Sequence, residues 1–187
     1  MRRPAILLSL FVPLLAAGCT QSATPVAAPS PTAAVTPTAA VTLKGAGRFT
    51  DADTAAIAYD RKLAPAGSQA SLTAESIGGR TTSSLVVEGL LPKRTYGAHL
   101  HTNPCGAKPD DAGPHFQHHG KSASAANEVW LDVTTDAEGT GRATARNDWA
   151  LEPGHLPRAL VIHAQPTTST GPSAGTAGSR VACLTLN

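Results

Sequence analysis

Short segments of alternating or β-branched residues, separated by turn residues, most limit the folds open to this 187-residue chain. Alternation with a period of two is typical of a strand with one buried face, and Gly, Pro, Asp and Asn clusters between segments indicate turns. No segment has a convincing helical period. Eight such strands predict an all-β fold, an antiparallel sandwich or barrel. The expected strands cover residues 54–59, 70–74, 81–88, 95–101, 128–134, 141–149, 158–163 and 180–186.

Four histidines lie on or beside these strands. His99 and His101 are two residues apart on one expected strand, so both rings leave the same face. His163 ends another strand, and His115 follows a Gly-Pro turn. Imidazole is the commonest metal ligand, and nitrogen ligands without thiolate favour Cu(II) over structural zinc. The set predicts a redox-active copper site, although a His-x-His pair alone is also common on exposed strands that bind no metal.

The N-terminus predicts export. Arg2 and Arg3 precede an apolar run over residues 5–17, which is followed by Gly-Cys at Cys19. The run is too short to span a bilayer comfortably and has the layout of a signal peptide. It resembles a bacterial lipoprotein signal over residues 1–18, in which Cys19 is acylated and anchors the protein on the extracytoplasmic face of a cell membrane. An ordinary cleaved secretion signal, with Cys19 carrying no lipid, is the alternative.

Composition then separates a tether from a domain. Residues 19–41 are rich in Ala, Pro and Thr and hold no charged or aromatic residue, so we expect a flexible tether. Residues 42–187 are long enough for one domain with a core. Loss of Arg2 and Arg3 with the signal leaves equal numbers of basic and acidic residues. A neutral domain without a basic stripe argues against a nucleic-acid partner.

The chain has three cysteines, an odd count for an exported protein. An exposed thiol is unfavourable in an oxidising compartment, so a lipid on Cys19 leaves Cys105 and Cys183 to form one disulfide. The chain-entropy model assigns about 4–5 kcal/mol to a closed loop of this size. Two unpaired buried cysteines are the alternative.

Five motifs follow one another in order and span nearly all of residues 42–187: Gly89-Leu90-Leu91-Pro92, Gly97-Ala98-His99-Leu100-His101, Gly113-Pro114-His115-Phe116, Leu160-Val161-Ile162-His163 and Gly175-Thr176-Ala177-Gly178-Ser179-Arg180-Val181-Ala182-Cys183. Together these motifs resemble the copper/zinc superoxide dismutase family. The resemblance implies an eight-stranded Greek-key β-barrel. It also implies copper on His99, His101, His115 and His163, a disulfide from Cys105 to Cys183, and Arg180 beside the copper.

The implied chemistry is the conversion of superoxide to dioxygen and hydrogen peroxide at a copper ion that alternates between Cu(II) and Cu(I). A guanidinium beside the open coordination position would attract and orient the small anion. Arg180 and His115 are therefore the expected catalytic residues, with His115 an ordinary copper ligand or a proton relay. An ordinary strand-end ion pair is the alternative for Arg180.

The sequence departs from the family at zinc. In copper/zinc members of the family, two further histidines and an aspartate follow the Gly-Pro-His-Phe motif and bind zinc. The equivalent stretch of this chain, residues 125–132, contains no histidine. His118 and His119 follow His115 too closely to reproduce that spacing and are interpreted as part of a solvated loop. Asp132 falls outside the aligned ligand position. These departures make zinc doubtful and resemble the copper-only branch of the family.

The segment between His163 and Arg180 also differs from the family in a way that favours the copper-only branch. It contains no acidic or basic residue, whereas the family has charged residues that steer the substrate and an aspartate that bridges the copper and zinc ligands. We expect weaker electrostatic steering of the substrate than in charged-loop members. The sequence thus predicts an exported, lipid-anchored, copper-dependent superoxide dismutase. A copper-sequestering lipoprotein without turnover is the main alternative. A zinc-stabilised structural β-domain is disfavoured because structural zinc sites usually include thiolate.

Overall fold

The computed structural model describes residues 40–187. The expected signal peptide over 1–18, Cys19 and nearly all of the expected tether lie outside this range, so they stay predictions. Within the described range, no helix reaches the length and apolarity that a membrane span requires.

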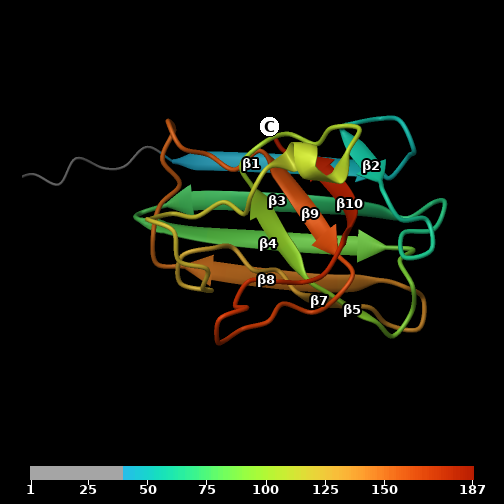
Figure 1. Ribbon diagram of the computed structural model, residues 1–187. Helices are drawn as coiled ribbons and strands as arrows, with labels where there is room; N and C mark the ends of the chain where they lie inside the picture. The colour runs from blue at the N-terminus through green and yellow to red at the C-terminus, as the bar shows by residue number, and fades with distance from the viewer. Residues whose placement is uncertain (1–39) are drawn as a thin grey trace, which may run out of the picture. The chain divides into compact units, whose positions relative to one another are not determined.

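The described residues form the strands β1 (Val41–Arg48), β2 (Ala56–Ala58), β3 (Gln69–Ile77), β4 (Arg80–Glu88), β5 (Thr95–Tyr96), β6 (Ala98–His101), β7 (Val133–Thr134), β8 (Gly141–Asn147), β9 (Ala159–His163) and β10 (Arg180–Thr185), with one short 3-10 helix, η1 (Pro109–Ala112). Eight of these strands form two four-stranded antiparallel sheets, of order β1-β3-β4-β8 and β2-β10-β9-β6, while β5 pairs with β7. The long strands of the first sheet are crossed obliquely by β9 and β10 of the second (Figure 1).

The first sheet follows the alternation in its sequence. In β3 and β4 every second side chain is buried, and the residues between them face outward. Leu72 is paired with Leu85 in register, and both are buried in the core. Gly78 and Gly79 join the two strands with φ values of 60° and 81°, and a two-residue hairpin turn of type I′ requires a positive φ at both positions.

The second sheet is covered on both faces. All five residues of β9 are buried, and its register with β6 pairs Leu100 with Leu160 and His99 with Val161. Because side chains alternate along a strand, Leu100 faces the main core and His99 faces the opposite side. That outer side carries a second small apolar cluster: Ile57, Cys105, Ala112, Ala159, Val161 and Cys183. The outer face of the second sheet is therefore a second buried layer, and the expected metal ligands lie in it.

The all-β antiparallel fold class is confirmed as a sandwich, but the described residues form ten strands where eight were expected. The strand β1 was missed because Gly45 and Gly47 interrupt its apolar alternation. A side chain on Gly47 would come within 2.7 Å of the Ala56 Cβ atom, so glycine permits a close approach to β2 of the other sheet. The strand expected over 95–101 divides at Gly97, and the one expected over 128–134 is reduced to β7.

Candidate metal centre

The four predicted histidines meet on the outer face of the second sheet. His99 and His101 lie on β6 and His163 ends β9. His115 lies outside the named strands, but an isolated antiparallel bridge sets it opposite His101 at the free edge of β6. One ring nitrogen from each histidine lies within 4.8 Å of the others. The structure thus brings together the whole predicted ligand set.

Backbone carbonyls orient two of the rings. The Nδ1 atom of His101 lies 2.9 Å from the carbonyl oxygen of Gly113, and the Nδ1 atom of His163 lies 3.3 Å from that of Gly178. A carbonyl only accepts, so each Nδ1 carries the proton and donates it. In a neutral imidazole this leaves Nε2 as a bare acceptor, available to a metal.

A buried carboxylate orients the third ring. Glu128 is 1% exposed, and its Oε2 atom lies 2.9 Å from the Nδ1 atom of His115. The Glu128 carboxylate also accepts hydrogen bonds from Gln117 Nε2 and Trp130 Nε1, each at 2.7 Å. Burial acts to raise the Glu128 pKa, but the hydrogen bonds from His115, Gln117 and Trp130 outweigh it and hold the pKa below its ordinary value. Glu128 is therefore an ionised acceptor that leaves the Nε2 atom of His115 free to face the other rings.

The spacing of the nitrogens fits one metal ion. The Nδ1 atom of His99 lies 3.0 Å from the Nε2 atom of His115, and the Nε2 atoms of His101 and His163 lie 3.4 Å apart. Two nitrogens bound to one ion at about 2.0–2.1 Å, with angles of about 90–110°, would be about 2.8–3.4 Å apart. Four imidazoles without thiolate form a donor set that suits copper.

Burial keeps three of these rings neutral. Burial, with a smaller contribution from the neighbouring histidines, lowers the pKa of His99 and of His101 to about 2. Burial likewise lowers the pKa of His163 to about 4. A metal binds the unprotonated nitrogen, so at neutral pH no proton has to leave these rings first.

A cavity of about 790 Å³ opens over the histidines, and His115, His163, Lys121 and Arg180 are among its lining residues. The Arg180 side chain donates from Nη1 to the Pro109 carbonyl at 2.7 Å and from Nη2 to the Gly113 carbonyl at 2.8 Å. A guanidinium has five N–H donors, so three remain for a ligand. Its Nε atom is 4.0 Å from an oxygen of Asp110, a fully exposed partner, so the ion pair considered as the alternative adds little.

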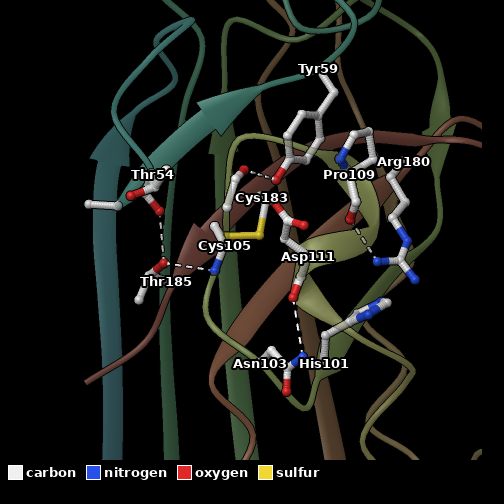
Figure 2. Close-up of a disulfide and its surroundings, with 12 residues drawn as sticks. Thr54, Tyr59, His101, Asn103, Cys105, Pro109, Asp111, Arg180, Cys183 and Thr185 are labelled. Carbon is white, nitrogen blue, oxygen red and sulfur yellow. Dashed lines mark hydrogen bonds between the residues drawn. A yellow bond between two sulfur atoms is a disulfide. The ribbon is translucent and has the colours of Figure 1, made fainter.

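The loop over residues 102–114, which supplies these carbonyls, is fixed by a disulfide (Figure 2). Cys105 and Cys183 are bonded, with their Cα atoms 5.8 Å apart, as the sequence predicts. The Tyr59 hydroxyl donates to the Gly106 carbonyl at 2.9 Å, and the Cys105 amide donates to the Thr185 hydroxyl at 3.1 Å. The disulfide therefore helps to place the acceptors of both His101 and Arg180.

Two other predicted features lie apart from the ligand group. The His118 ring stacks on Trp149, with 4.5 Å between centroids, and His119 is exposed beside it. Asp132 is not a member of the group of possible ligands, but it contacts Thr167, whose hydroxyl meets His99.

Sequence reasoning missed the roles of Glu128 and Thr167. One feature of the sequence could have identified Glu128: it is an acidic residue directly before Val129 and Trp130, in the stretch where the family has zinc ligands. Thr167 is one of several threonines in a polar loop, and nothing in the sequence distinguishes it.

An antiparallel β-sandwich with four converging imidazoles beside an arginine-lined cavity defines a metal-binding β-protein. Residues 67–185 match the family model for copper/zinc superoxide dismutase (SODC), and the chain belongs to this family. Among solved structures, the Cu/Zn superoxide dismutase from Brucella abortus is similar in fold, with a TM-score of 0.52 and 18% sequence identity over 78% of this chain and 97% of that chain. Comparison with curated protein sequences gave no match.

Proposed function

We propose that this protein is an exported, copper-dependent superoxide dismutase that works without the family's usual zinc. The observation that carries the proposal is the convergence of four imidazole nitrogens under an open cavity with Arg180 in its wall. Storage of copper alone would not require an anion-binding group at that position.

Copper held by the ring nitrogens of the four histidines would supply one-electron redox chemistry, by which two superoxide ions and two protons would give dioxygen and hydrogen peroxide. Arg180 attracts the anion and orients it through its remaining N–H groups. The two carbonyls that brace Arg180 hold it in place, so little side-chain freedom is lost when the anion binds.

The position of Glu128 supports a site that needs no zinc. If His115 bridged two metals, both of its ring nitrogens would be ligands. Here its Nδ1 atom is hydrogen-bonded to Glu128, whose pKa favours the ionised acceptor. Glu128 would keep His115 an ordinary copper ligand and raise its basicity, as outer carboxylates do for metal-bound histidines.

Export and anchoring rest on the N-terminal sequence and agree with the disulfide, which is typical of an oxidising compartment. We expect a Cys19→Ser variant to move from the membrane fraction to the soluble exported fraction. Retention of that variant in the membrane fraction would exclude a lipid on Cys19 as the anchor.

The enzymatic proposal is tested by copper analysis and a dismutation assay on the same preparations. His163→Ala should lose both stable copper binding and activity. Arg180→Ala should retain one equivalent of copper and lose about 10–100-fold in kcat/KM, because a hydrogen bond to a charged group contributes about 1.5–3 kcal/mol. Arg146→Ala, an exposed arginine on β8, serves as the matched control and should behave as wild type. One equivalent of copper in the wild type without turnover would favour the sequestering lipoprotein instead.

A further inference from the structure

His99 is the one ligand of the four whose outer nitrogen contacts a hydroxyl. Its Nε2 atom lies 2.7 Å from the Oγ1 atom of Thr167. Thr167 belongs to the uncharged loop between β9 and β10, whereas His99 is on β6, so this contact joins two separate segments. The family match and the predicted ligand set assign no role to Thr167.

Asp132, which lies directly before β7, holds Thr167 at two points. The Thr167 amide donates to the Oδ2 atom of Asp132 at 2.7 Å, and the Thr167 hydroxyl donates to its Oδ1 atom. An ionised carboxylate only accepts, so the single hydroxyl proton of Thr167 points to Asp132. The Thr167 oxygen must then accept from His99, which places the proton of His99 on Nε2.

This proton assignment decides which nitrogen of His99 is bare. With Nε2 protonated, a neutral ring leaves Nδ1 as the acceptor, and Nδ1 is the atom 3.0 Å from the Nε2 atom of His115. The other three ligands are oriented through Nδ1 and leave Nε2 bare. His99 therefore needs an orienting partner on the opposite side of its ring.

Close packing keeps the loop in reach of that partner. A side chain at Gly97 would come within 2.6 Å of the Ala177 Cβ atom and 3.1 Å of the Thr167 Oγ1 atom. Gly97 lets the β9–β10 loop lie against the start of β6, and the Asp132 contacts fix Thr167 there.

We propose that Thr167 and Asp132 are positioning residues for His99. Thr167 sets the tautomer and ring orientation of His99, and Asp132 sets the direction of the Thr167 hydroxyl. The same contacts tie the β9–β10 loop, which forms part of the cavity wall, to the segment before β7. The expected effect of Thr167 and Asp132 on copper binding rests on the proposed copper site, whereas the assignment of the His99 tautomer does not.

The first test uses the full-length protein without metal. Long-range ¹H–¹⁵N spectra distinguish protonated from bare ring nitrogens. We expect His99 to show one tautomer, with the proton on Nε2, in the wild type and in Thr167→Ser. In Thr167→Val the preference should be lost, and in Asp132→Asn it should weaken. Asp132 is exposed, so its variant does not endanger the fold. An unchanged His99 tautomer in both Thr167→Val and Asp132→Asn would overturn the proposal.

The second test measures copper affinity and the electron paramagnetic resonance spectrum of the Cu(II) form. Thr167→Val should bind copper about 10–100-fold more weakly, the usual effect of removing an outer partner of a metal-bound histidine, and its spectrum should shift. Thr167→Ser should restore both, and Thr170→Val, an exposed threonine on the same loop, should change neither. Wild-type affinity and spectrum in Thr167→Val would contradict the proposal. Failure of the wild type itself to bind copper would contradict the proposed function and leave the tautomer test to decide the role of Thr167.

Discussion

The two sheets of the domain show how its structural and chemical roles are divided. The first sheet buries one face against the core and exposes the other, with its outward positions occupied by residues such as Thr82 and Arg142. The second sheet buries both faces, because the disulfide loop and the β9–β10 loop lie over its outer side. Under that second cover, buried histidines such as His99 and His101 stay neutral and near one another. The candidate metal centre therefore lies where loops add a third layer to this sandwich.

The largest expected effect that separates the two sheets is acid destabilisation of the metal-free protein. His99, His101 and His163 bind protons at about pH 6.5 when unfolded, but only near 2 or 4 when folded. Between about pH 6.5 and 4 the unfolded state holds more protons, so the free energy of unfolding falls as pH falls. The slope is up to about 1.4 kcal/mol per pH unit for each ring. Below about pH 4 His163 is protonated in both states and no longer contributes to the slope, whereas His99 and His101 continue to contribute.

Urea unfolding at several pH values, with hydrogen exchange at single amides, measures this effect. The first sheet contains no histidine, so we expect β6 and β9 to lose protection before β3 and β4. A free energy of unfolding that stays constant between about pH 6.5 and 4.5 would refute the neutral, buried state of these rings.

Removal of the disulfide is the next largest test of the outer layer. A Cys105→Ser/Cys183→Ser protein should lose about 2–5 kcal/mol of stability in denaturant unfolding, because its unfolded chain gains freedom over a 78-residue separation. The matched control is Ser83→Ala on the inner side of the first sheet. The buried hydroxyl of Ser83 has no hydrogen-bond partner, so its removal should be neutral or slightly stabilising. An equal loss of unfolding free energy in the two proteins would contradict the special role of the disulfide in stabilising the outer layer.

Glu128→Ala should have a smaller effect, visible in metal binding. It removes the acceptor of His115, Gln117 and Trp130, and we expect copper affinity to fall about 10–100-fold. Glu75→Ala, an exposed glutamate on β3, should leave the affinity unchanged. Competition with a chelator of known affinity measures both, and an equal affinity in the two variants would argue against a role for Glu128.

The smallest expected effect is that of salt. Among the described residues lining the cavity, Lys121 and Arg180 are cationic, Glu128 is paired, and the β9–β10 loop contributes no charge. We expect kcat/KM to fall only shallowly with ionic strength and Lys121→Ala to lower it about twofold. Lys44→Ala, an exposed lysine on β1, should have no effect. A steep fall in the salt titration of the wild type would show strong steering.

The difference between regular strands and the places where the two sheets approach closely explains which elements the sequence could predict. The hairpin of β3 and β4 alternates clearly, and the His-x-His pair of β6 required only the two-residue period. The strand β1 was hidden, because its inward positions at Gly45 and Gly47 are small where two sheets approach. Glycine at these positions looks like a turn signal in the sequence.

The sequence predicted the candidate metal ligands but not the residues that hydrogen-bond to them and orient their rings. The ligands carry the residue type that binds metal, so His115 could be identified before its neighbours were known. Its partner Glu128 is 13 positions away, and the partner of His99 is 68 positions away on another loop. Such pairings depend on how loops cover the second sheet, which local sequence patterns do not encode.

The most direct test of the proposed copper-dependent dismutase activity is a titration of the metal-free protein with copper, with superoxide dismutation followed by pulse radiolysis at each addition. The account predicts that the rate rises linearly and stops rising at one equivalent of copper per chain, with zinc having no influence. Full binding of one copper without dismutation, or activity that requires added zinc, would contradict it.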